Sequence, residues 1–74
     1  MAMSKKFLPK YKKMMDRLKT ARLEANMTQE EVGAKIKQPQ AFVSKIERGE
    51  RNVDAIEMAQ LAKLYGKSID YFVS

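Results

Sequence analysis

Polar side chains that could contact the bases of a nucleic acid recur at helical spacing in the stretch KQPQAFVSKIERGER, residues 37–51. In the major groove a Gln can bond adenine, a Lys can reach guanine or a phosphate, and a Ser suits donor or acceptor edges. Ala and Phe can touch the methyl group of thymine. Each residue taken alone is also explained as an ordinary surface residue, and Phe42 equally well as a core residue. As a group they predict a base-contacting surface formed by Gln40, Ala41, Phe42, Ser44 and Lys45.

Groups that suit the phosphate backbone stand on both sides of this surface. Gln29 lies near the start of the preceding predicted helix, where unpaired backbone N–H groups can also bind a phosphate. Arg48, Arg51 and Asn52 lie where the chain leaves the predicted base-contacting helix. Phosphate contacts orient a protein on a duplex without reading its sequence. We therefore expect these four residues to contact phosphates.

A short helix over about residues 39–47 must hold the base-contacting side chains. A helix of that length is unstable alone and persists only if one of its faces is packed against neighbours. Val43 and Ile46, three residues apart, supply an apolar face at helical spacing. The polar side chains must then point outward, and the N-terminal ones would lie deepest in a major groove.

The rest of the chain also follows helical periodicity, and no useful length alternates as a strand does, so the predicted fold class is all-α with five helices. Residues 1–9 are expected to form a flexible basic arm, and residues 10–74 a single domain. Its central unit is the pair of helices over about 28–47, joined by a tight turn. The expected helices cover about 10–25, 28–37, 39–47, 55–65 and 69–73.

Local signals mark the ends of these helices. Thr28 with Glu31, and Asp54 with Glu57, have the spacing of a capping box, and Ser68 can cap the last helix. The expected helix ends are Asn26, Lys37, Gly49 and Gly66, of which Asn and Gly tolerate a left-handed backbone.

Gly33 stands inside the second helix, where it costs about 0.5–1 kcal/mol relative to Ala. We interpret it as a point where another helix passes very close. Pro39 fits the first position of the third helix, which leaves a turn of two or three residues.

The 74-residue chain contains no Cys and no His. These absences exclude disulfides and thiol or imidazole catalysis, and they remove the usual zinc ligands. There is no glycine-rich phosphate loop either, so we expect no enzyme activity, no cofactor and no metal site. No apolar run approaches the roughly 18 residues of a membrane span. We therefore expect no membrane contact and a cytoplasmic location.

Positive charge gathers in the first third of the chain. Residues 1–22 hold eight Lys or Arg and one acid, Asp16, within a net charge of +6 for the whole chain. A field of that sign attracts polyanions such as nucleic acid. The same charges are explained equally well as a solvated tail that keeps a small protein soluble.

From Leu18 to Phe72 the chain resembles the helix-turn-helix of the Cro and lambda-repressor (XRE-like) family of transcriptional regulators. The segments TQEE, VSKIERGER and LAKLYGKSIDYF carry the likeness, at matching separations. The resemblance implies a five-helix DNA-binding domain that usually acts as a dimer on a palindromic operator. It also implies that Gln29 anchors its helix to a phosphate and that the base-contacting set named above occupies the recognition positions. Arg22 and Glu47 match a family pair that forms an internal salt bridge.

This sequence departs from the family pattern around the turn. The family often has Ala at position 33, Gly at 37, Ser or Thr at 39 and a small residue at 42. Here the residues are Gly33, Lys37, Pro39 and Phe42. Lys37 is expected to be strained if the turn needs a positive φ.

These observations predict a bacterial or phage regulator, a repressor or small operon controller, that binds double-stranded DNA as a homodimer without a small-molecule ligand. Tyr71, Phe72 and Val73 are the predicted dimer contact, and the alternative for them is packing against the fourth helix. The competing function is an antitoxin-like module whose apolar C-terminal segment binds a partner protein. RNA binding is disfavoured because the aromatic platforms that stack bases are missing.

Overall fold

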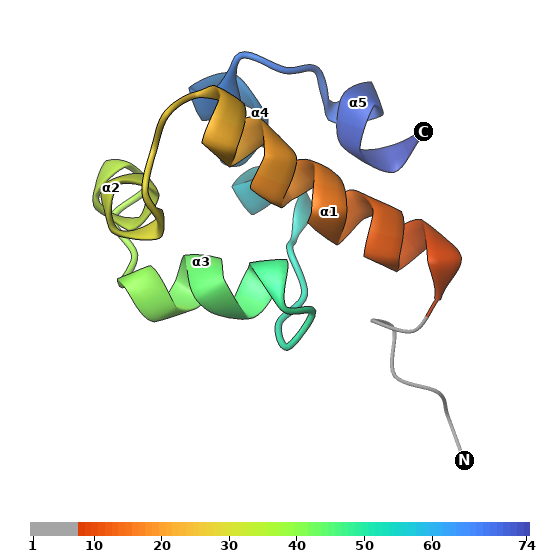
Figure 1. Ribbon diagram of the computed structural model, residues 1–74, viewed down its shortest axis with the longest axis horizontal. Coiled ribbons are helices and arrows are strands. Elements are labelled where there is room, and N and C mark those ends of the chain that lie inside the picture. The colour runs from red at the N-terminus through yellow and green to blue at the C-terminus, as the bar shows by residue number, and fades with distance from the viewer. Residues whose placement is uncertain (1–7) are drawn as a thin grey trace.

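Five helices follow one another along residues 8–74, the part of the chain that the computed structural model describes, and this part contains no strand. This architecture confirms the all-α, five-helix prediction. In Figure 1, α1 crosses the molecule with α3 on one side of it and α5 on the other. The helices are α1 (Pro9–Glu24), α2 (Gln29–Lys35), α3 (Gln40–Glu47), α4 (Ala55–Tyr65) and α5 (Ile69–Val73).

The basic arm predicted over residues 1–9 lies outside the described residues, apart from its last two positions. Leu8 occupies the N-cap position of α1 without a side-chain capping bond, and Pro9 is the first residue of that helix, where its missing N–H costs little. Within residues 8–74, no helix has the length and hydropathy needed to span a bilayer.

Three helices begin at side-chain caps that the sequence predicts. The hydroxyl of Thr28 accepts from the backbone N–H of Glu31 at 3.0 Å, and the Glu31 carboxylate accepts from the N–H of Thr28 at 2.9 Å. Asp54 and Glu57 form the same reciprocal pair at 2.8 and 3.0 Å. Ser68 caps α5 through the N–H of Tyr71. These bonds satisfy N–H groups that a helix cannot pair internally.

The first four helices end in one geometry. In each, a residue with positive φ follows the helix, and the next N–H bonds to the carbonyl five residues back. This Schellman arrangement satisfies carbonyls at the helix end and turns the chain sharply. The residues with positive φ are Asn26, Lys37, Gly49 and Gly66.

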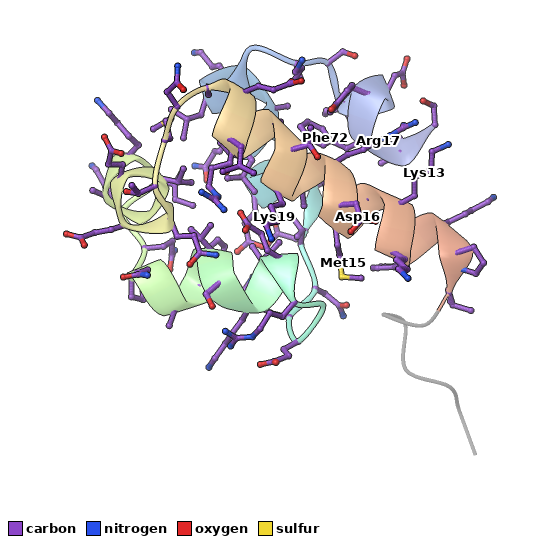
Figure 2. All side chains as sticks on the ribbon, viewed as in Figure 1. Lys13, Met15, Asp16, Arg17, Lys19 and Phe72 are labelled. Atoms are coloured by element: carbon purple, nitrogen blue, oxygen red, sulfur yellow. The ribbon has the colours of Figure 1, made fainter. Side chains whose placement is uncertain are left out.

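All five helices contribute to the core, and its largest fully buried side chains are Leu18, Val32, Leu61 and Phe72. Phe72 is 1% exposed, so its prediction as a dimer contact is wrong. The reason is a contact from α1: Arg17 donates to the carbonyl of Tyr71 at 2.6 Å and to that of Ser74 at 2.9 Å. These bonds hold α5 against α1 with Phe72 inward, and Figure 2 shows Arg17 and Phe72 where the two helices meet.

Candidate nucleic-acid interface

The third helix has one buried face and one open face. Phe42, Val43 and Ile46 are 6%, 3% and 2% exposed. With about 100° of turn per residue, these three positions fall within an arc of about 100°. The opposite side is therefore turned to solvent. Gln40, Ala41, Lys45 and Arg48 are exposed there, and Ser44 is half-buried.

The burial of Phe42 removes this residue from the predicted base-contacting surface. The sequence suggested a DNA-facing side chain, but the ring lies in the core. Its position beside Val43, and four residues before Ile46, places it within the buried arc. The guanidinium carbon of Arg51 lies 4.3 Å from the ring centroid and covers one face of the ring. Phe42 thus fixes the helix and cannot touch a thymine.

The turn before α3 is tight because Gly33 has no side chain. A Cβ at this position would lie 2.6 Å from the carbonyl oxygen of Gln38 and 3.3 Å from the nitrogen of Gln40. The close neighbours are thus the backbone of the turn and the first residue of α3, so the next helix approaches Gly33 at its start rather than along its length. Lys37 has a φ of 59°, a left-handed conformation that costs a side-chain-bearing residue about 1–2 kcal/mol. Pro39 occupies the N-cap position of α3 without a side-chain capping bond, so that helix begins one residue later than predicted, at Gln40.

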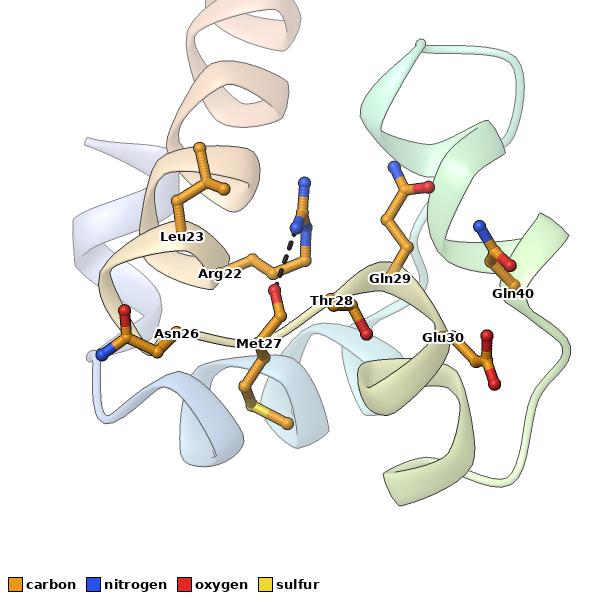
Figure 3. A pocket seen from close by; sticks show the side chains of 8 residues that line it. All are labelled: Arg22, Leu23, Asn26, Met27, Thr28, Gln29, Glu30 and Gln40. Atoms are coloured by element: carbon orange, nitrogen blue, oxygen red, sulfur yellow. Dashed lines mark hydrogen bonds between the residues drawn. The ribbon is translucent and has the colours of Figure 1, made fainter.

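A buried ion pair joins α1 to the end of α3. Arg22 donates from Nε and Nη2 to the two carboxylate oxygens of Glu47, at 2.8 and 3.1 Å. The two side chains are only 9% and 5% exposed. Arg22 also donates to the carbonyl of Met27 at 2.9 Å, the bond drawn in Figure 3. The salt bridge implied by the family resemblance is therefore present, and the bonds to Glu47 raise the pKa of Arg22.

Gln29 ties α2 to the same carboxylate. Its amide nitrogen donates to Glu47 Oε1 at 3.1 Å, and the side chain is half-buried. Figure 3 shows Gln29 and Gln40 on neighbouring helices beside a cleft of about 590 Å³, where the end of α1 meets the starts of α2 and α3. Sequence reasoning missed both this bond and the cleft, because they depend on how three helices meet.

Both arginines after α3 are paired with acids. Arg48 donates to the carboxylate of Glu50 at 3.0 and 3.2 Å and to the hydroxyl of Ser44 at 2.5 Å. Arg51 donates to the carboxylate of Glu57 at 3.0 and 3.1 Å. The bond from Arg51 is the largest cause of a lowered pKa at Glu57.

These two arginine pairs were not predicted, and they change what the arginines can do. Arg51 is fixed between Glu57 and the ring of Phe42, and it also donates to the carbonyl of Asn52 at 2.9 Å. Asn52 itself is exposed in the loop between α3 and α4.

Among residues 8–74, no three His, Cys, Asp or Glu side chains cluster so that they could hold a metal ion.

Comparisons with known proteins find a matching family and a similar solved structure. The family model described as Helix-turn-helix (HTH_3) matches residues 18–72. A solved structure, titled as an XRE-family like protein from Pseudomonas syringae pv. tomato str. DC3000, is 36% identical with a TM-score of 0.78. The match covers 85% of this chain and 77% of that chain. No curated protein sequence matches the chain.

The family match extends from the second half of α1 to α5 and includes the whole interface described above. The chain therefore belongs to the XRE-family helix-turn-helix proteins, the DNA-binding transcription regulators of the Cro and lambda-repressor type.

Proposed function

We propose that this regulator recognises a specific double-stranded DNA site by placing α3 in the major groove, and that it represses or controls a small operon. The observation that supports this most directly is the orientation of α3. Phe42, Val43 and Ile46 hold it in the core, and its polar side faces solvent. A helix held in this way can enter a groove without unfolding or rotating.

Each exposed position of α3 suits a contact with a base. Gln40 is the first residue of the helix and can bond N6 and N7 of adenine together. Ala41 can touch a thymine methyl, and Lys45 can reach guanine or a phosphate. The hydroxyl of Ser44 can still donate to a base while it accepts from Arg48.

Residues at both ends of α3 are proposed to contact the phosphates. Gln29 borders the cleft next to Gln40 and keeps an N–H and an oxygen beyond its bond to Glu47. Asn52 is exposed past the other end of α3. Arg51 lies beside it with a side chain 41% exposed, although Glu57 offsets much of its charge.

The proposed dimer contact keeps only Val73 of the set predicted from the sequence. Ile69 and Val73 are 45% and 55% exposed, and they border an apolar hollow of about 230 Å³ together with Met14 and Val53. Val53 belongs to the segment that leads from α3 to α4, so this patch lies close to the interface. Two copies joined here would present two α3 helices to successive major grooves, roughly 34 Å apart, on a palindromic operator.

The antitoxin-like alternative loses its main support. It relied on an apolar C-terminal segment available to a partner, but Phe72 is buried and Tyr71 half-buried within the same chain. Only Val73 of that set remains largely exposed.

Selection of bound fragments from random double-stranded DNA at about 0.15 M salt tests the proposal. We expect one enriched motif made of two inverted half-sites, because a symmetric dimer reads the same sequence twice. Recovery of fragments without a shared motif would contradict sequence recognition. A motif with a single half-site would contradict the dimer but leave base reading by α3 in place.

A further inference from the structure

The guanidinium of Arg48 is held in one orientation on the open side of α3. Of its five N–H groups, two donate to the carboxylate of Glu50 and one to the hydroxyl of Ser44. One N–H remains on each of the two terminal nitrogens. The side chain is 55% exposed, so a duplex can reach these remaining donors.

The bond to Ser44 also decides how far along α3 the guanidinium lies. Arg48 follows the last residue of the helix, where a long side chain without a partner would be free to extend into solvent. At 2.5 Å from the Ser44 hydroxyl, the guanidinium instead lies over the preceding turn. Ala41, Ser44 and Arg48 follow one another at helical spacing, so the guanidinium lies in the middle of the exposed row.

The carboxylate of Glu50 makes a phosphate an unfavourable target for Arg48. It lies 3.0 Å from Nε and offsets the positive charge of Arg48. It would also repel any phosphate that Arg48 approached. The edge of guanine carries no charge and offers two acceptors, O6 and N7, to two donors of one guanidinium. A fixed guanidinium also loses less conformational entropy when it makes that contact.

We infer that Arg48 reads a guanine in the major groove, and that Glu50 and Ser44 position its guanidinium for this contact. The inference rests on the proposed placement of α3 in the groove. It changes the role of Arg48, which the sequence suggested as a phosphate contact. It also gives Glu50 a role, since this acid adjoins the DNA-binding surface of a basic protein.

The Arg48→Ala variant tests the guanine contact. Bound fragments are selected from random DNA with the wild type and with the variant, and the two motifs are compared. We expect the wild-type motif to contain a guanine at one position of each half-site, and the variant to lose only that preference. Affinity for the wild-type site should fall about 5- to 150-fold, while affinity for scrambled DNA and its salt dependence stay unchanged.

The two ways in which this experiment can fail are distinct. A motif whose guanine survives Arg48→Ala, with an equal loss on all sequences and a salt slope lower by about 0.9, would show a phosphate contact and overturn this inference alone. If the wild type selects no motif, the proposed function fails, and this inference fails with it.

The Glu50→Gln variant tests the positioning role, with Asp70→Asn as the control. Both changes remove one exposed negative charge, but Asp70 lies on α5. We expect Glu50→Gln to release Arg48 to a phosphate, to bind scrambled DNA several-fold more tightly than the control, and to steepen the salt slope by about 0.9. Equal effects of the two substitutions would overturn the positioning role.

Discussion

Glu47 is the residue that connects the three helices of the interface. Its carboxylate accepts two bonds from Arg22 on α1 and one from Gln29 on α2, while the residue itself ends α3. Because the carboxylate is 5% exposed, water cannot replace a lost partner. The Arg22–Glu47 pair therefore helps to fix the angle of α3 relative to the rest of the domain.

At this scale we predict that Glu47→Gln destabilises the protein by about 3–5 kcal/mol, because it leaves the buried charge of Arg22 without its counter-charge. Urea denaturation followed by circular dichroism measures the change. The double substitution Arg22→Met with Glu47→Leu is the control, since it removes both charges. We expect the double variant to recover most of the lost stability, and a loss as large as that of the single variant would contradict this explanation.

Among the elements, the turn between α2 and α3 depends on Gly33. We predict that Gly33→Ala costs about 1–3 kcal/mol, because the new methyl group would meet the carbonyl oxygen of Gln38 at 2.6 Å. Thermal unfolding measures the effect. Helix propensity alone predicts the opposite sign, a gain of about 1 kcal/mol.

The neighbouring substitution Ala34→Gly serves as the control for propensity. Ala34 is exposed in the same helix, so this change should cost about 1 kcal/mol through propensity alone. A stabilised Gly33→Ala variant would show that the turn can move away, and that α3 is held less tightly than described.

The parts of these elements that the sequence predicts correctly are local. The capping boxes of Thr28 with Glu31 and of Asp54 with Glu57 need only residues three apart, so their spacing is sufficient. The signals that end helices near Asn26, Gly49 and Gly66 are local in the same way. Val43 and Ile46 likewise predict the inward face of α3, because their spacing alone defines it.

The parts that were missed or placed wrongly depend on how the chain packs in three dimensions. Two apolar residues define the direction of a buried face but not its width, so Phe42 could be placed on either side. Phe72 is buried because Arg17, more than fifty residues away, holds α5 on α1. The pairing of Arg51 with Glu57 depends on the path of the loop between α3 and α4. Such contacts cannot be obtained from periodicity.

For the whole molecule, the prediction concerns the apolar patch of Met14, Val53, Ile69 and Val73. We expect Val73→Asp to leave the fold intact, because the side chain is 55% exposed, and to weaken dimerisation at least about tenfold by placing a charge in an apolar contact. Sedimentation at micromolar concentration, with and without the selected DNA, measures this. The variant should still bind a single half-site, and an unchanged dimer would contradict the proposed patch.

The central claim is that the outward side of α3 reads bases, and the affinity of Gln40→Ala for the selected site and for a scrambled duplex tests it most directly. Both duplexes should be measured at one salt concentration, because phosphate contacts depend on salt. We predict a loss of about 1–3 kcal/mol on the selected site and almost none on the scrambled duplex. Equal losses on both duplexes would contradict base reading and would leave α3 a helix that contacts only the phosphates.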